Sequence, residues 1–73
     1  MVEVRLFAGL RQGRQKIYQM EPELIKNVQD IMDVLAIQRK DVNILLINGF
    51  HQKPETEVKD GDVVSLFPAV GGG

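Results

Sequence analysis

Hydrophobic and polar residues alternate near both ends of the chain. Residues 2–7 read VEVRLF and residues 63–67 read VVSLF. Because successive side chains of a strand point to opposite faces of its sheet, a period of two predicts strands with one buried face. The positions predicted to face a helix are Val4, Leu6, Val64 and Leu66, with Val2 in the same register. Phe7 and Phe67 then fall on the other face of the sheet.

The first strand is predicted to pair with a second strand directly after it. Residues 8–14, AGLRQGR, contain two glycines, which are free to take positive φ in a turn. Residues 15–20, QKIYQM, then read as a strand. This spacing favours an antiparallel hairpin with a longer loop. Pro22 interrupts any strand that would continue past residue 20.

One helix is predicted over residues 28–37, VQDIMDVLAI. Asn27 precedes it and is a good N-cap residue, because its side chain can accept a hydrogen bond from the first helical turn. Four apolar residues recur at helical spacing and define one apolar stripe: Val28, Ile31, Met32 and Leu35. We therefore expect this helix to pack on a sheet, with Met32 as a core residue rather than a ligand.

The second half of the chain predicts three more strands. Residues 43–48, NILLIN, form an apolar run typical of a buried strand. Asn48-Gly49 predicts a tight turn into a short strand over residues 50–53. In the last strand, Pro68 lacks a backbone donor and is expected to end the pairing. The order of elements predicts a two-layer α+β domain that leaves one sheet face to solvent or to a partner.

Composition narrows the class of protein. The 73 residues have room for one domain, which we place at residues 1–70, and contain no cysteine and a single histidine, His51, expected at the surface. A metal site is therefore not expected, nor is any bound cofactor. No apolar run is long enough for a signal sequence or a membrane span, so we expect a cytoplasmic protein without a membrane partner.

Charge argues against nucleic acid as a partner. The formal net charge is −1, and residues of both signs are spread along the chain. Four cations come closest to a basic patch: Arg5, Arg11, Arg14 and Lys16. We interpret them as a solvated strand face and turn.

Three glycines, Gly71, Gly72 and Gly73, end the chain and are predicted to form a flexible tail over residues 71–73. From Ala69 onward, an extended chain would reach roughly 15 to 18 Å beyond the domain, and its last residues could enter a channel too narrow for any Cβ. The group that it delivers is the carboxylate of Gly73. Adenylation by ATP would turn this carboxylate into an electrophile, and the activating enzyme would supply the catalytic groups.

Several segments in the right order resemble one known family. LFAGLR at residues 6–11, the NV that opens the helix, the ING turn and above all DGDVVSLFPAVGGG at residues 60–73 resemble the MoaD/ThiS sulfur carriers. The chain is most similar to the small subunit of molybdopterin synthase. The resemblance implies a ubiquitin-like β-grasp, with a mixed four- to five-stranded sheet and one main helix packed on one face.

The resemblance also implies a function. Gly72 and Gly73 match the family's functional pair, and Gly71 stands where Ser or Thr is common. An E1-like adenylating enzyme would use ATP to activate Gly73, which becomes a thiocarboxylate and donates its sulfur to the large subunit of molybdopterin synthase. The chain would then be a carrier and not itself an enzyme.

Three alternatives remain open at this point. The same chemistry could serve thiazole synthase in thiamine biosynthesis, because the short connections resemble the thiamine-type carriers, whereas FAGLR and FPAV resemble the molybdopterin type. The activated Gly73 could instead form an isopeptide bond with a target lysine, as in a ubiquitin-like modifier. In a plain binding module the glycines would be incidental.

A docking surface is predicted beside the tail. Phe7, Phe67, Pro68 and Val70 would form an exposed apolar patch that binds both the activating enzyme and the sulfur-accepting enzyme. The alternative is that the two aromatic rings close one end of the core.

Overall fold

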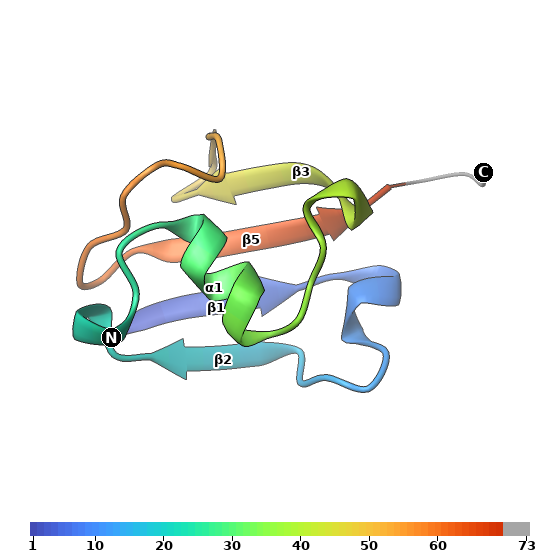
Figure 1. Ribbon diagram of the computed structural model, residues 1–73, viewed down its shortest axis with the longest axis horizontal. Helices are drawn as coiled ribbons and strands as arrows, with labels where there is room; N and C mark the ends of the chain where they lie inside the picture. Colours follow the sequence, from blue (N-terminus) through green and yellow to red (C-terminus); the bar gives the residue numbers. More distant parts are fainter. Residues whose placement is uncertain (70–73) are drawn as a thin grey trace.

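The computed structural model describes residues 1–69 and has a five-stranded mixed sheet with one α-helix on one face (Figure 1). The strands are β1 (Val2–Leu6), β2 (Ile17–Met20), β3 (Val42–Ile47), β4 (Phe50–His51) and β5 (Val63–Pro68). The helices are α1 (Val28–Val34) and three 3₁₀ turns, η1 (Ala8–Arg11), η2 (Pro22–Leu24) and η3 (Arg39–Asp41). In this part of the chain no helix has the length and apolar character needed to cross a membrane.

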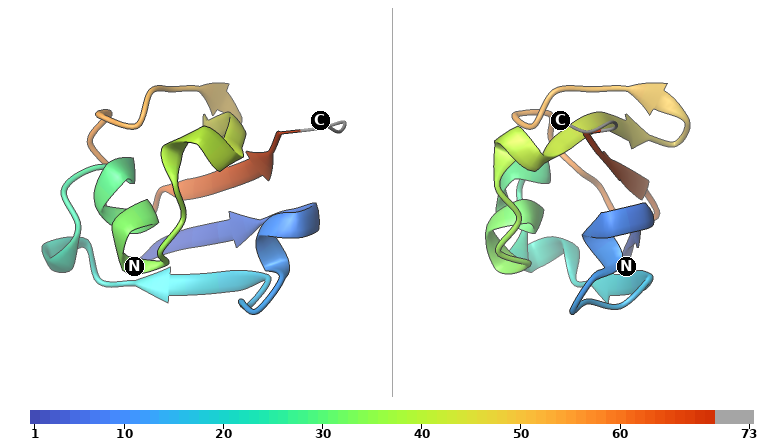
Figure 2. Two further views of the ribbon diagram at one scale, coloured as in Figure 1. Left: turned by 45° about the vertical axis from the view of Figure 1, so that its right-hand side comes forward. Right: turned by 90° about the vertical axis from the view of Figure 1, so that its right-hand side faces the viewer.

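The strands lie in the order β2-β1-β5-β3-β4. β1 and β5, from the two ends of the described chain, are parallel neighbours at the centre, with Val4 opposite Val64. The outer pairs, β1–β2, β3–β5 and β3–β4, are antiparallel. This is the β-grasp topology that the sequence resemblance implied. In Figure 2 the view at right angles to Figure 1 shows α1 on one side of the sheet, and none of the helices of residues 1–69 covers the other side.

The core lies between α1 and the covered face of the sheet. Val4, Leu6, Val64 and Leu66 are fully buried, as the alternating pattern predicted, and so are Val28, Ile31 and Met32 of α1. Tyr18 and Met20 of β2 and Leu35 pack against this cluster while remaining partly exposed. Burial of such side chains is the main force that stabilises a domain of this size.

The helix ends at Val34, three residues earlier than predicted. Ala36 takes the left-handed conformation, with φ of 57°. Its N–H donates to the carbonyl of Asp33 (3.2 Å), and the N–H of Ile37 donates to that of Met32 (2.8 Å). These two bonds form a Schellman C-cap, which turns the chain so that Ile37 enters the core.

Arg14 binds the same end of the helix. Its guanidinium donates to the carbonyls of Leu35 (3.0 Å) and Ala36 (3.1 Å), and also to Leu10 of η1 (3.2 Å). These carbonyls have no further partner within the helix, so a cation here satisfies them and interacts favourably with the helix dipole. Arg14 thereby links the loop after β1 to the end of α1.

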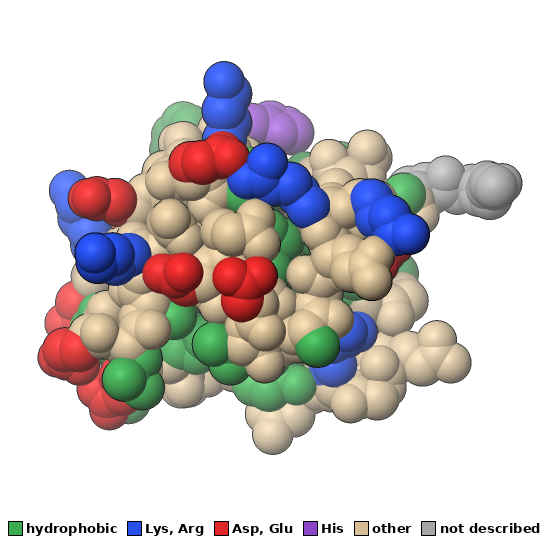
Figure 3. Space-filling model, in the orientation of Figure 1, with side chains coloured by type: hydrophobic (Ala, Val, Ile, Leu, Met, Phe, Trp, Pro, Cys, Tyr) green, Lys and Arg blue, Asp and Glu red, His purple; other side chains and the backbone are tan. Residues whose placement is uncertain are grey.

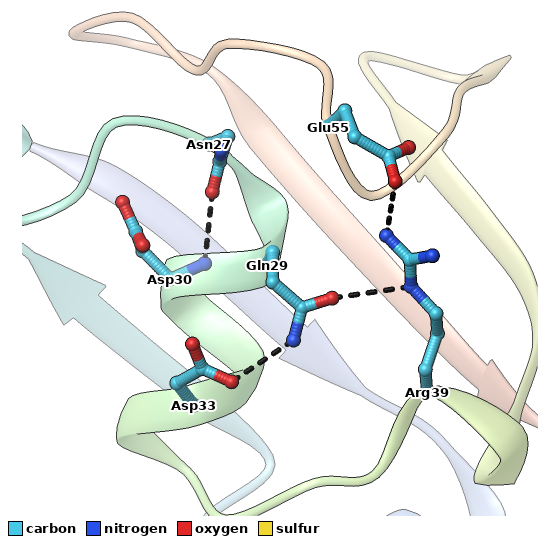
Figure 4. Close-up of polar contacts among 6 residues, drawn as sticks. All are labelled: Asn27, Gln29, Asp30, Asp33, Arg39 and Glu55. Carbon is cyan, nitrogen blue, oxygen red and sulfur yellow. Dashed lines mark hydrogen bonds and ion pairs between the residues drawn. The ribbon is translucent and has the colours of Figure 1, made fainter.

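The start of the helix is capped as predicted. The Asn27 side chain accepts a hydrogen bond from the N–H of Asp30 (3.0 Å), while the Asp30 carboxylate accepts one from the N–H of Lys26 (2.8 Å). Figure 4 shows the cap beside a surface network in which Gln29 bonds to Asp33 and Arg39 bonds to both Gln29 and Glu55. The network joins α1 to η3 and to the loop after β4. Its members are exposed, so we expect it to add little stability.

Several strand boundaries differ from the prediction, those of β1 and β3 by a single residue. β2 begins at Ile17 rather than residue 15, and β4 covers only Phe50–His51 of the predicted 50–53. The expectation that Pro68 ends the pairing was wrong. Pro68 lies opposite Val42 as the last residue of β5, and the N–H of Ala69 still donates to Asp41 (3.2 Å). One missing donor therefore does not prevent the next residue from pairing.

The tight turn between β3 and β4 is present. Asn48 and Gly49 both have positive φ, 53° and 86°, as a type I′ hairpin turn requires. The Asn48 amide oxygen also accepts a hydrogen bond from the N–H of Val63 (2.9 Å). The turn is thus held against the start of β5.

The strained C-cap yields a prediction. Ala36→Gly should raise the free energy of unfolding by about 0.5–1 kcal/mol, because alanine pays a steric cost in the left-handed region that glycine avoids. Thermal unfolding followed by circular dichroism should show a midpoint about 2–8 °C higher. As the control, Val34→Gly places glycine in regular helix and should lower the midpoint. A lower midpoint for both variants would contradict this role of Ala36.

Candidate functional site: an aromatic patch on the open face

Two aromatic rings stack on the uncovered face of the sheet. Phe7 and Phe67 have ring centroids 4.3 Å apart and planes inclined by only 11°. The parallel register explains this, because Leu6 is opposite Leu66 and the next residue of each strand points to the other face. The N–H of Phe7 donates to the carbonyl of Leu66 (3.2 Å), which continues the pairing beyond β1.

Two aliphatic side chains of β3 extend this aromatic surface. Ile44 lies opposite Phe67, and Leu46 lies opposite Ser65, so both share the open face with Phe67. Both are half-buried, whereas Leu45 and Ile47, which alternate with them along β3, are buried on the side of α1. The prediction of a wholly buried strand over residues 43–48 was therefore wrong for half of its apolar side chains. We call Phe7, Ile44, Leu46 and Phe67 the open-face patch.

Sequence reasoning missed Ile44 and Leu46. A continuous apolar run has no alternation, so it does not show which side chains point away from the core. The pairing of β3 with β5 supplies this information. It places Ile44 opposite Phe67, which the sequence had already assigned to the uncovered face. The register of two strands was needed to assign the face of the third.

Pro68 does not join the open-face patch. It follows Phe67 and so points to the same side as Leu66. There it lines a hollow of about 260 Å³ together with Leu10 and Ile37 from the edge of the core, and with Gly9, Arg14, Asp41 and Ala69. The predicted docking residues thus separate into Phe7 with Phe67 on one side of the sheet and Pro68 on the other. Val70 and Gly71 to Gly73 lie outside the described residues.

Charged groups flank the patch. Arg11 places its guanidinium carbon 5.4 Å from the centroid of the Phe7 ring, and its Nε donates to the carbonyl of Leu6 (2.8 Å). This is the geometry of a cation–π contact. On the neighbouring part of the face, Arg5 donates to Glu3 (2.5 Å). Hydrogen bonds from Arg5 and then from Gln19 hold the pKa of the Glu3 carboxyl below its usual value, so Glu3 stays ionised at neutral pH.

This arrangement favours binding another protein. The open-face patch contains stacked aromatic rings and is flanked by an arginine, and both residue types are enriched at the centres of protein interfaces. Its two aliphatic side chains add apolar area that a partner could bury. β5 carries the chain from this surface to Ala69 at one end of the sheet (Figure 1). A partner bound to the patch would therefore lie close to the last described residue. Among residues 1–69, no three His, Asp or Glu side chains come together as a metal site, and His51 is exposed.

Comparisons with known proteins agree with this geometry. The model of the ThiS family matches residues 4–73. No curated protein sequence matches the chain. Among solved structures, the chain is similar to a putative molybdopterin converting factor, subunit 1, from Pyrococcus furiosus, with 31% identity and a TM-score of 0.71 over 94% of this chain and 97% of that one.

Two further structures cover almost the whole chain. SAMP1 from Haloferax volcanii is 25% identical, with a TM-score of 0.74 over 99% of this chain and 98% of that one. A chain of the complex of subunits 1 and 2 of molybdopterin-converting factor from Helicobacter pylori is 26% identical, with a TM-score of 0.66 over 99% and 97%. The chain is thus a small ubiquitin-like protein of the ThiS- and MoaD-like carrier or modifier class, and it belongs to the ThiS family.

Proposed function

We propose that the chain is a sulfur carrier whose Gly73 carboxylate is activated and thiolated by partner enzymes. An oxygen of the carboxylate attacks the α-phosphate of ATP, forming an acyl-adenylate and releasing pyrophosphate. Hydrosulfide, the simplest sulfur donor, then attacks the acyl carbon and loses its proton, and AMP departs with the original oxygen. The product is a thiocarboxylate at Gly73, formed without a catalytic side chain or bound cofactor of the carrier itself.

One observation carries this proposal. The match to the ThiS family extends from residue 4 to Gly73 and therefore includes the terminal glycines as well as the folded domain. The open-face patch gives independent support, because it offers a docking surface on the strand that leads to these glycines. An E1-like adenylating enzyme is the partner that the chemistry requires, and we propose that the reaction takes place in the cytoplasm.

For the recipient of the sulfur we propose molybdopterin synthase. The similarity to subunit 1 of molybdopterin converting factors from two organisms supports this choice, and in one of them subunit 1 was solved together with subunit 2. The large subunit of the synthase would then accept the glycine end. Thiazole synthase in thiamine biosynthesis is the rival recipient, because the family that matches is named after ThiS.

A protein modifier is the second candidate function. The similarity to SAMP1 favours it, since that protein is described as a small archaeal modifier protein. The activation step would be the same, but the amine of a target lysine would displace AMP and form an isopeptide bond. A carrier gives one thiocarboxylated species, whereas a modifier gives a series of conjugates of different mass.

The glycine end provides the first test of this function. After incubation with ATP, a sulfur donor and the adenylating enzyme, intact-mass spectrometry should show one oxygen of the chain replaced by sulfur. A chain that lacks Gly72 and Gly73 should keep its mass unchanged, because it cannot present the terminal carboxylate in the enzyme's channel. A full chain that stays unmodified with an active enzyme would contradict the carrier function, and a ladder of conjugates would select the modifier.

The open-face patch provides the second test. Phe67→Asp should weaken binding to the adenylating enzyme about tenfold or more, since a desolvated aromatic contact is lost and a charge is buried in its place. Isothermal titration calorimetry measures the affinity. A thermal unfolding curve of each variant confirms that it is folded.

Two variants serve as matched controls for Phe67→Asp. Phe50→Asp alters a phenylalanine that is 72% exposed and lies outside the patch, and Pro68→Ala alters the neighbour on the other side of the sheet. Both should leave the affinity within about twofold of the original chain. Equal losses for Phe50→Asp and Phe67→Asp would show that the patch is not the docking surface.

A further inference from the structure

A second surface of the open face combines apolar side chains with positive charge. A hollow of about 240 Å³ lies between the end of β1, η1 and the start of β2. Apolar atoms predominate in its lining, which includes the side chains of Phe7 and Ile17 together with Arg5, Arg11 and Lys16. The side chain of Leu6 is buried on the other face of the sheet, so this residue borders the hollow through its backbone. Phe7 belongs both to this lining and to the open-face patch, so the two surfaces are continuous. We call this surface the cationic hollow.

The charge around the cationic hollow is unusual for this chain. Residues 4–20 contain four cations and no Asp or Glu, although the whole chain has a net charge of −1. Acidic residues gather instead at the far end of the β1–β2 hairpin, where Glu21 precedes η2 and Glu23 lies within it. A hydrogen bond to Asp60 is the main cause that raises the pKa of the N-terminal amine, and the charges of Glu21 and Glu23 add to it. Figure 3 shows Asp and Glu side chains concentrated over η2 at the left of the molecule. The β1–β2 hairpin is therefore electrically polarised along its length.

The three cations of the hollow differ in whether a carboxylate of this chain pairs with them. Arg5 is paired with Glu3. The Nε of Arg11 donates to the carbonyl of Leu6, and its two terminal nitrogens remain available. Within residues 1–69, neither Arg11 nor Lys16 forms an ion pair. Ile17 is 48% exposed at the edge of the hollow. Two unpaired cations thus border an accessible apolar surface.

The chemistry of this surface defines what fits it. A free phosphate would meet the cations but would leave the apolar lining exposed to water. A purely apolar side chain would bury the lining but would also desolvate Arg11 and Lys16 without compensation, which is costly. An apolar side chain flanked by carboxylates satisfies both parts, because the carboxylates can form charge-assisted hydrogen bonds with the two cations.

We infer that the cationic hollow receives an apolar side chain flanked by Asp or Glu residues on the surface of the adenylating partner. This inference rests on the proposed function, since it assigns a binding site for that partner. The continuity with the open-face patch allows one partner surface to cover both. Because these cations lie at one end of the β1–β2 hairpin and the acids at the other, they would also orient the carrier as it approaches an acidic surface.

Salt-dependent association rates test the electrostatic part of the inference. We expect Arg11→Gln with Lys16→Gln to slow association with the adenylating enzyme about tenfold at low ionic strength, as measured by stopped-flow fluorescence. At high salt the rates of the original chain and the variant should converge, because screening removes the steering. Lys26→Gln with Lys59→Gln is the matched control, with the same change of net charge outside the hollow, and should slow association less than twofold.

Ile17→Ser tests whether the hollow is occupied. It removes apolar surface from a half-exposed position and should speed dissociation severalfold while leaving the association rate unchanged. If Ile17→Ser leaves the dissociation rate unchanged, no apolar side chain of the partner occupies the hollow. If the two double variants slow association equally, the cations of the hollow have no special role. Association of the chain with a short RNA, lost in the Arg11 and Lys16 variant, would overturn the assignment to a protein partner.

Failure of this inference is distinguishable from failure of the proposed function. Thiocarboxylation is measured for the same variants at saturating enzyme. If the variants bind like the original chain and are fully thiocarboxylated, the cationic hollow has no role but the carrier function holds. If the original chain binds the enzyme and is never thiocarboxylated, the proposed function fails.

Discussion

The parallel pairing of β1 with β5 is the interaction on which the rest of the structure depends. It joins the first strand of the chain to the last and places both at the centre of the sheet. Val2, Val4, Leu6, Val64 and Leu66 are buried on one side of this pair because the two strands are in register. On the other side the same register stacks Phe7 on Phe67. Stability and the candidate docking surface thus arise from one set of backbone hydrogen bonds.

A single helix covers only one face of a sheet, and this constraint explains where function can lie. The seven residues of α1 bury the inner face, and the Schellman cap with Arg14 ends the helix where Ile37 must enter the core. The outer face carries apolar side chains that are partly exposed to water, and this exposure does not stabilise the free protein. An apolar face that is left uncovered in a folded domain is best explained by binding, which agrees with the membership of the ThiS family.

Charged residues add a second distinction, along the β1–β2 hairpin, to the difference between the two faces of the sheet. The hairpin β1–β2 carries cations at the end near η1 and acids at the end near η2, so this part of the open face has an electrostatic direction. In the proposed function the terminal glycines take part in the chemistry, and the folded domain provides recognition. A carrier of this kind needs a surface that several enzymes can bind in turn, and apolar contacts with a charged border suit such exchange.

The sequence by itself determined the strands, the helix start and the two-layer architecture. Alternation is a local property, so it correctly placed Val4, Leu6, Val64 and Leu66 in the core, and the Asn27 cap is equally local. The family motifs pointed to the class of protein, because a short sequence of glycines at the end of such a domain has a specific chemical use.

Only the tertiary structure decided which apolar residues were left for a partner. The outward direction of Ile44 and Leu46 depends on the pairing of β3 with β5, which lie far apart in the chain. Arg14 likewise reaches the helix end through contacts that no local pattern encodes. The physical reason is that periodicity shows how side chains alternate within an element, whereas strand register and packing determine which of them are covered.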